Sequence, residues 1–443
     1  MVNPSLKAVR GAFVDFVDDP FSTSQLNSEL QSVRYLQDGL LIIEDGKIIE
    51  FDTYSNLSDR YAQIPTEVHE GLILPGFIDL HVHYPQTEMI GAYGEQLLAW
   101  LDKYVFPTES KFRDVDYARQ IASFFLDELL RNGTTSAVVL TTIFPASVDV
   151  LFEEAQRRNM RLIAGQVLMS RNAPEYLLNE PQKAYAENRE LIQKWHGQDR
   201  LLYAITPRFA ITSTDAELKL AAKLKEEYPD LYIHTHLSEN LKEIEFTAAL
   251  FPTSKDYLNV YEQFDLVGDR SIFAHCVHLD ESAFERMSNS GAAIAYCPTS
   301  NLFLGSGLFK LHQAKSPEYQ IKVGIGSDVG AGTSFSQLKS MGEAYKISQL
   351  QGQSLSAFKA FYLATLGGAK ALSLDDKIGS FDRGKEADFV VLDVNATPLQ
   401  ALRNRATKGD FSLEAIASQL FGLMTLGDER SIKATYVAGK LAL

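Results

Sequence analysis

The sequence predicts an α/β fold, namely a (β/α)8 TIM barrel with a small β-sandwich domain formed from both chain ends. Two observations carry this prediction. Through the middle of the chain, short apolar segments alternate with amphipathic segments of helical period, which is typical of parallel βα units. Near both ends, short strand-like segments separated by turn residues are typical of an antiparallel layer.

The terminal β segments are expected at residues 7–16, 40–52, 387–393 and 434–443. Asp45 and Gly46 lie between two apolar runs and predict a hairpin turn. Because the same pattern appears at both ends, we expect one composite β-sandwich domain from residues 1–74 and 377–443. The barrel domain then occupies residues 75–376.

The barrel strands are expected at residues 77–83, 134–140, 161–168, 201–207, 231–237, 271–277, 292–298 and 322–328. Residues 92–113 form a longer connection than is usual after a first strand, and we predict that they cover the substrate as a loop. Residues 397–430 interrupt the last β layer with a helical pattern, and no function is assigned to them.

Composition limits the class of partner. The chain has 443 residues, 45% of them hydrophobic and 22% charged, as in ordinary globular proteins. Its formal net charge of −15 disfavours nucleic acid and anionic membranes as partners, and favours a small-molecule substrate. Two cysteines, Cys276 and Cys297, are too few for a disulfide scaffold. Without a signal peptide or a long apolar run, the sequence predicts a cytoplasmic enzyme.

Residues of the types that ligate divalent metals stand at the ends of four predicted strands. They are His81 and His83, His236, His275, and Asp328. His81 and His83 share one face of their strand because they are two residues apart. His234 lies on the same face as His236 but deeper in the strand. One such histidine alone would more often be a hydrogen-bonded core residue. Together, at the carboxyl ends of barrel strands, they favour a zinc or ferrous iron site.

A metal-activated water requires groups that take up and return protons, because a bound metal lowers the pKa of water from 15.7 toward about 7. Asp328 and Glu239, which follows His236 by three residues, are the candidate catalytic carboxylates. The alternative for Glu239 is a solvated carboxylate that caps the next helix.

The segments PGFIDLHVH, HLSE, AHCVHL, CPTSN and GIGSD resemble the amidohydrolase superfamily, in its aminohydrolase branch of chlorohydrolases and deaminases. The resemblance covers nearly the whole chain and includes EADFVVLD near the C-terminus. It implies a metal site made of His81, His83, His236, His275 and Asp328. It also implies a single ion, Zn²⁺ or alternatively Fe²⁺, because residues 161–170 lack the lysine that dinuclear members carboxylate.

Further motifs, HYPQ, WLDKYVFPTE, TPRF and HLSEN, resemble the guanine-deaminating members of this branch. The resemblance implies hydrolysis of guanine to xanthine and ammonia, a homodimer, and substrate contacts from His83, Tyr84, Pro85, Gln86, Trp100, Arg208, Phe209, His236, Glu239 and Asp328. The residues at 84 and 85 depart from the pattern of these relatives. A guanidinium at Arg208 suits the C6 carbonyl of guanine, and its alternative is a surface salt bridge.

Two other functions use the same framework. A related deaminase or chlorohydrolase would act on 8-oxoguanine, cytosine, an adenosine-derived substrate or a triazine, and would differ in the residues that recognise the ring. A non-catalytic barrel scaffold belongs to another class and would lack the ligands that this chain retains. His278 is expected to support the site, whereas His69, His196 and His312 are expected in surface or loop positions.

Overall fold

The computed structural model describes residues 6–22, 26–94 and 96–442, and contacts within the chain divide it into two compact units. One unit comprises residues 79–127 and 137–335. The other comprises residues 1–78, 128–136 and 336–443. The domain boundaries expected from the sequence, at residues 74 and 377, stay a prediction.

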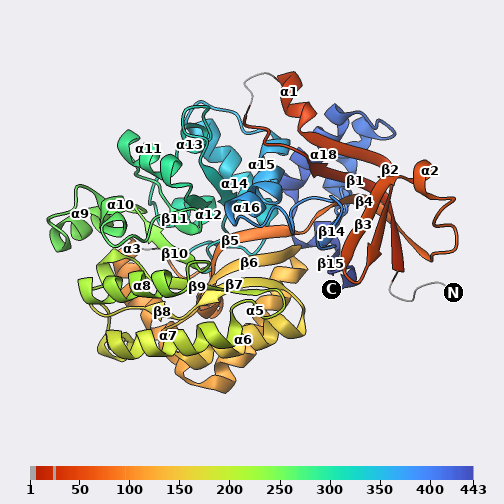
Figure 1. The fold of residues 1–443 in the computed structure, drawn as a ribbon. Helices are drawn as coiled ribbons and strands as arrows, with labels where there is room; N and C mark the ends of the chain where they lie inside the picture. Colours follow the sequence, from red (N-terminus) through yellow and green to blue (C-terminus); the bar gives the residue numbers. More distant parts are fainter. Residues whose placement is uncertain (1–5, 23–25, 95, 443) are drawn as a thin grey trace. The chain divides into compact units, whose positions relative to one another are not determined.

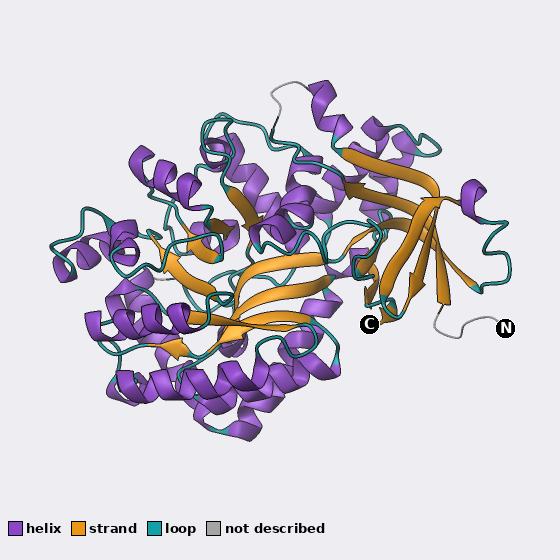
Figure 2. Ribbon diagram, in the orientation of Figure 1, coloured by secondary structure: helices purple, strands orange, loops and turns teal. Residues whose placement is uncertain are grey.

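Eight parallel strands form the barrel that the sequence predicts, visible in orange in Figure 2. In sheet order they are β5 (Phe77–His83), β6 (Thr134–Leu140), β7 (Arg161–Gly165), β9 (Leu201–Pro207), β10 (Tyr232–Leu237), β11 (Ser271–His275), β12 (Ala293–Tyr296) and β13 (Lys322–Ile325). The short β8 (Val167–Leu168) pairs with β9. Beyond β13, the N–H of Asp328 donates to the carbonyl of His81 at 2.8 Å, which joins the last strand to the first.

The barrel strands are almost entirely buried, as expected for parallel strands that pack on both faces. Amphipathic helices connect them: α5 (Val115–Arg131), α6 (Pro145–Arg157), α7 (Pro181–Trp195), α8 (Asp215–Glu227), α9 (Leu241–Leu250), α10 (Tyr257–Glu262), α11 (Glu281–Ser290), α12 (Pro298–Phe303) and α13 (Leu311–Ala314). In Figure 1, α6 and α7 run side by side below the strands. Thr214 and Asp280 cap α8 and α11 through their side-chain oxygens.

The connection at residues 92–113 is helical rather than an open loop. Its elements are α3 (Leu97–Trp100), a π-helical turn (Leu101–Val105), α4 (Phe106–Glu109) and a 3₁₀ turn (Ser110–Arg113). Apolar side chains at helical spacing are buried here, including Leu97, Trp100 and Phe106, and they belong to a core cluster with Phe209. This segment therefore packs firmly at the carboxyl ends of the strands.

The second sheet has seven strands from both chain ends, in the order β16-β15-β14-β4-β1-β2-β3. They are β1 (Leu6–Phe16), β2 (Val33–Glu44), β3 (Lys47–Thr53), β4 (Thr66–Pro75), β14 (Phe389–Leu392), β15 (Ile432–Val437) and β16 (Lys440–Leu441). Asp45 and Gly46 form the predicted hairpin turn, and both have positive φ, at 50° and 79°. The composite origin of this sheet is thus confirmed.

The remaining helices of this unit are α1 (Leu26–Gln31), α2 (Tyr54–Leu57), α14 (Gln337–Leu350), α15 (Ala357–Leu363), α16 (Leu366–Ala371), α17 (Pro398–Arg403) and α18 (Leu413–Leu426). Helices α17 and α18 account for the helical pattern predicted at residues 397–430. Helix α18 packs against α14 and α15, so this segment has a structural role in the core of its unit.

Candidate active site

Five side chains from the carboxyl ends of β5, β10, β11 and β13 meet at the rim of the barrel. The Asp328 Oδ1 atom lies 3.2 Å from Nε2 of both His81 and His83. The His236 ring centroid is 4.7 Å from that of His81 and 5.4 Å from that of His275. Nitrogen and oxygen donors from all five residues fall into two overlapping groups, each within 4.8 Å. The structure thus brings together every residue that the sequence suggested as a metal ligand.

The backbone is specialised where these residues leave their strands. His275 and Asp328 adopt positive φ, 72° and 51°, which is uncommon for residues with side chains and clusters at functional sites. Gly326 precedes Asp328, and a Cβ at this position would lie 3.0 Å from Cβ of His81 and 2.9 Å from Sγ of Cys297. Glycine therefore allows the last strand to approach the first closely enough to deliver Asp328.

Acceptor groups fix the orientation of two of the rings. His236 Nδ1 lies 2.7 Å from the carbonyl oxygen of Arg208, and His275 Nδ1 lies 2.9 Å from Oδ1 of Asn301. A carbonyl oxygen only accepts, so each Nδ1 carries the hydrogen. In the neutral ring, Nε2 then keeps its lone pair directed into the cluster, as metal coordination requires.

His234 orients the ring of His81 in a similar way. Its Nε2 lies 2.8 Å from Nδ1 of His81. Both rings are fully buried. His83 differs, because the amide nitrogen of Gln86 faces its Nδ1 at 3.1 Å. His234 is therefore a support for a ligand, and Gln86 links the cluster to the pocket wall.

The charge states of the cluster suit a cation. Burial lowers the pKa of His81 to about 3 and holds the pKa of His236 well below its usual range, so both rings are neutral at pH 7. Burial alone would raise the pKa of Asp328, but interactions with His81 and His83 outweigh it and keep that carboxyl ionised. Burial also lowers the pKa of His83. His275 differs, because Glu239 and Asp328 outweigh its burial and raise its pKa. Imidazole nitrogens around one carboxylate fit a borderline divalent ion such as Zn²⁺ or Fe²⁺.

Glu239 stands beside this cluster without joining it. Its Oε2 lies 3.6 Å from Nε2 of His275, and its Oε1 accepts a hydrogen bond from the Ser306 hydroxyl at 3.0 Å. Burial raises the pKa of Glu239 above its ordinary value. The residue is only 2% exposed, so it is not a solvated helix cap. The capping carboxylate of α9 is instead Glu243, which accepts the N–H groups of Glu239 and Asn240.

Asp79 is a buried residue of the site that sequence reasoning missed. It shares the inward face of β5 with His81, and its Oδ1 accepts the N–H of His81 at 3.2 Å and that of Ser327 at 2.9 Å. Burial raises the pKa of Asp79 to about 7. The two-residue spacing Asp79-His81-His83 was the available signal.

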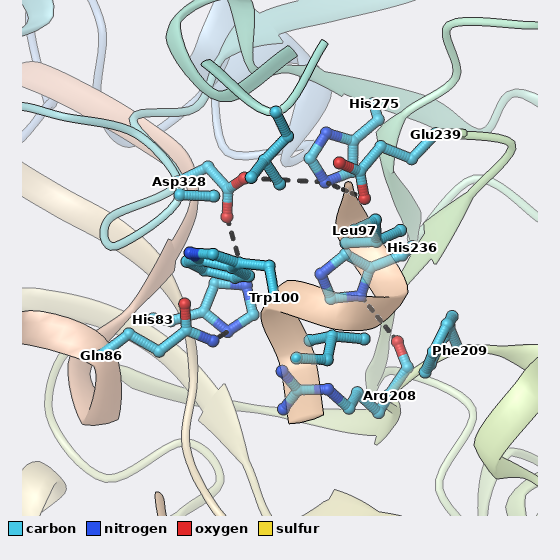
Figure 3. A pocket seen from close by; sticks show the side chains of 13 residues that line it. His83, Gln86, Leu97, Trp100, Arg208, Phe209, His236, Glu239, His275 and Asp328 are labelled. Carbon is cyan, nitrogen blue, oxygen red and sulfur yellow. Dashed lines mark hydrogen bonds and ion pairs between the residues drawn. The ribbon is translucent and has the colours of Figure 1, made fainter. Parts of the chain in front are cut away.

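A pocket of about 380 Å³, counted with its mouth, opens directly onto the cluster. Figure 3 shows the side chains that line it. The wall includes four of the metal-ligand candidates, Glu239, and four aliphatic or small residues. It also includes four side chains singled out from the sequence: Gln86, Trp100, Arg208 and Phe209. Apolar side chains with a few polar groups among them are typical of sites for small organic ligands.

Trp100 covers the pocket from α3 and is 2% exposed. Its indole Nε1–H is buried and has no hydrogen-bond partner among the described residues. A buried unpaired donor is costly, so this group is available to a bound ligand. Tyr84 and Pro85 do not line the pocket: the Tyr84 hydroxyl donates to the carbonyl of Ser147, and both residues belong to a buried 3₁₀ turn.

Arg208 forms a buried ion pair in place of a surface one. Its Nη1 lies 2.9 Å from both carboxylate oxygens of Glu109, the last residue of α4. Gln86 Nε2 donates to the same carboxylate at 3.1 Å. Glu109 lies in the WLDKYVFPTE segment, but sequence reasoning gave it no role.

The other histidines and the cysteines lie outside the pocket wall. His278 Nε2 lies 2.7 Å from the Ser306 carbonyl, so it supports the residue that contacts Glu239. His69 and His196 have carboxylate partners away from the site, and His312 belongs to α13. Both cysteines are free and buried.

Comparison with known proteins identifies the family of this chain. The model of the amidohydrolase family matches residues 72–442. The chain belongs to the amidohydrolase family. Within it, the chain is 53% identical to a guanine deaminase of Escherichia coli K12 over 442 residues, covering 99% of this chain and 98% of that protein.

Solved structures of other amidohydrolases agree with this relationship. A guanine deaminase from Bradyrhizobium japonicum superposes with a TM-score of 0.95 at 42% identity, covering 99% of each chain. One from C. acetobutylicum, with guanine bound in its active site, gives 0.87 at 30% identity and covers 98% of this chain and 99% of that one. Among the described residues of the present amidohydrolase, no helix has the length and apolar character needed to cross a membrane.

Proposed function

We propose that this amidohydrolase hydrolyses guanine to xanthine and ammonia. The observation that carries the proposal is the direct junction of the His/Asp cluster with a pocket whose wall contains Gln86, Arg208, Phe209 and Trp100. The 53% identity to a guanine deaminase over nearly the full length of both chains supports the choice of substrate.

The pocket wall offers groups that match the polar edge of guanine. The Arg208 guanidinium donates to a carbonyl such as O6, and would face an unfavourable amino donor in adenine. The Gln86 Oε1 accepts one N–H, from Gly330, and its second lone pair can accept at the ring edge. Phe209 and Trp100 enclose the flat ring with apolar surface, and Trp100 can add one donor.

We propose His81, His83, His236, His275 and Asp328 as the residues that hold one divalent ion, Zn²⁺ in the first place and Fe²⁺ as the alternative. When bound, such an ion lowers the pKa of a water ligand toward about 7 and so supplies a nucleophile at neutral pH. The lone pairs at Nε2 of His236 and His275 support this assignment, because their Nδ1 hydrogens are already committed to protein acceptors.

The two carboxylates then divide the proton transfers. Asp328 or Glu239 accepts the proton of the attacking water as C2 of guanine is hydrated. Glu239 delivers a proton to N3, and a second transfer lets the amino group depart as ammonia. Burial favours the protonated form of Glu239, and the Ser306 hydroxyl holds its other oxygen, so one oxygen stays free to carry the proton.

We also propose that the enzyme works as a homodimer in the cytoplasm and takes part in purine breakdown or salvage, without nucleic-acid or membrane partners. Support comes from the acidic net charge of −15 and from the resemblance described above. Light scattering of the purified protein gives its mass directly, and a monomer would refute the dimer.

Ammonia release tests the substrate assignment. Purified protein is incubated with guanine, adenine, cytosine, 8-oxoguanine, a triazine and a set of nucleosides. We expect guanine to give the highest kcat/KM, with adenine lower by at least roughly 100-fold because Arg208 presents only donors. Preference for another substrate refutes the assignment to guanine but leaves the metal site standing.

A further inference from the structure

Glu109 is a fully buried carboxylate that takes no part in the proposed proton transfers. Both of its oxygens bind Nη1 of Arg208 at 2.9 Å, and Oε1 also accepts from Nε2 of Gln86 at 3.1 Å. Gln86 and Arg208 line the pocket, but Glu109 does not. Any influence of Glu109 on a ligand therefore acts through those two side chains.

These contacts anchor the Arg208 guanidinium at Nη1. Its carbon lies 5.9 Å from the ring centroid of Phe106, which precedes Glu109 by three residues in α4. Its backbone is also held, because the N–H donates to the carbonyl of Leu168 at 3.1 Å. Among the described residues, Nη2 and Nε have no hydrogen-bond partner, so they are the donors left for a ligand.

Gln86 is fixed from the same side. Its Oε1 accepts the N–H of Gly330 at 3.3 Å while its Nε2 donates to Glu109. Because an amide has distinct donor and acceptor ends, these two contacts determine which end faces each neighbour. Glu109 thus sets the donor pattern of two recognition residues at once.

The pair also sets the charge of the pocket wall. Arg208 is 2% exposed, and without Glu109 it would be a buried cation facing the ligand. Arg208 still donates hydrogen bonds when it is paired with Glu109, but the pair as a whole has no net charge. Such a wall favours a neutral oxopurine over an anionic one.

We propose that Glu109 is a positioning residue for substrate recognition, which orients Arg208 and Gln86 and makes the pocket select neutral over anionic oxopurines. This inference rests on the proposed function. The competing explanation is that Glu109 merely anchors residues 92–113. That explanation predicts no dependence on the charge of the ligand.

The test replaces Glu109 by glutamine and measures guanine turnover, with inhibition by hypoxanthine as the neutral ligand and urate as the anionic one. We expect Glu109→Gln to raise KM roughly tenfold or more while kcat falls less than about threefold, since the reacting groups are untouched. We also expect the affinity for urate relative to hypoxanthine to rise at least about fivefold, because Glu109 no longer compensates the positive charge of Arg208. Bound metal should stay at the wild-type level.

Glu88→Gln is the matched control. Glu88 forms an exposed ion pair, 2.7 Å long, with Lys111 of residues 92–113, and it does not contact Arg208. It should leave KM and the urate-to-hypoxanthine ratio unchanged. Wild-type values in Glu109→Gln, or the same changes in Glu88→Gln, would overturn the inference. If Glu109→Gln does not fold, Glu109→Asp decides, because its shorter side chain pairs less closely with Arg208. A raised KM with a raised urate-to-hypoxanthine ratio supports the inference, and a wild-type KM or a raised KM with an unchanged ratio refutes it.

The substrate assignment and the role of Glu109 can be tested separately. If the wild-type protein does not turn over guanine, the substrate assignment fails, and calorimetric binding of hypoxanthine and urate to the same variants still measures the charge effect. If the wild type is active and the variants behave alike, the role of Glu109 fails alone.

Discussion

Replacing Glu239 by glutamine removes one ionisable carboxyl group from the site and changes little else. The glutamine Oε1 can still accept the hydrogen bond from Ser306, which is 3.0 Å long in the present structure. Glu239 is not among the residues grouped as a metal site, so metal binding should persist. The variant therefore isolates proton transfer from binding and from the metal.

The expected loss is large. A positioned general acid or base contributes about 10²- to 10⁴-fold, which corresponds to roughly 3–5.5 kcal/mol of activation free energy. Because Glu239 is proposed to serve in more than one transfer, we expect kcat to fall by about 10³-fold or more, with KM changed only a few-fold. Steady-state ammonia release and metal analysis of the same sample measure both quantities.

Glu217→Gln is the control for this variant, because it also replaces a buried carboxyl group by an amide but lies outside the pocket wall. It should keep kcat and KM. The reasoning would be refuted if Glu239→Gln retained more than about a tenth of wild-type kcat with full metal content.

Three further outcomes follow from the geometry. Removal of bound metal by a chelator should abolish turnover, lower the unfolding midpoint by roughly 5–15 °C, and be reversed by Zn²⁺; calorimetry and activity check it, and full activity of metal-free protein would contradict it. Trp100→Phe keeps the ring but loses the unpartnered Nε1–H, so kcat/KM for guanine should fall roughly five- to thirtyfold, whereas unchanged kinetics would mean that the indole donates to no ligand. Burial raises the pKa of Glu217 from 4.5 to about 8, so the folded state holds this proton more tightly than the unfolded state, and the free energy of unfolding should fall as pH rises from about 4.5 to 8. Glu217→Gln should therefore stabilise the protein at pH 8 by up to about 5 kcal/mol, with little effect near pH 4.5. Denaturant unfolding at both pH values measures this difference. Equal effects at the two pH values would refute the linkage between Glu217 protonation and stability.

The barrel and the strand-end cluster could be predicted because both follow from local sequence patterns. Residues 272–274 of one strand are apolar and His275 follows them, and parallel strands bring such ends to one rim. His81, His83, His236, His275 and Asp328 could therefore be grouped before any distance was known. The structure adds how near they lie and which ring nitrogens face inward.

Other parts of the site depend on contacts that no local pattern contains. Glu109 and Arg208 are 99 residues apart, and only the folded chain shows that one carboxylate holds both Arg208 and Gln86. Tyr84 follows a ligand directly in sequence, yet the turn after β5 directs its hydroxyl to the Ser147 carbonyl instead of the pocket. Adjacency in sequence was thus a weaker guide to the pocket wall than position at a strand end.

The most direct test of the account follows the oxygen atom of water into the product. Metal-loaded enzyme is given guanine in H₂¹⁸O, and the purine product is analysed by mass spectrometry while ammonia is counted. We expect xanthine that carries a single ¹⁸O at C2, with ammonia released in equal amount. Unlabelled product, label at another carbon, or ammonia without xanthine would contradict it.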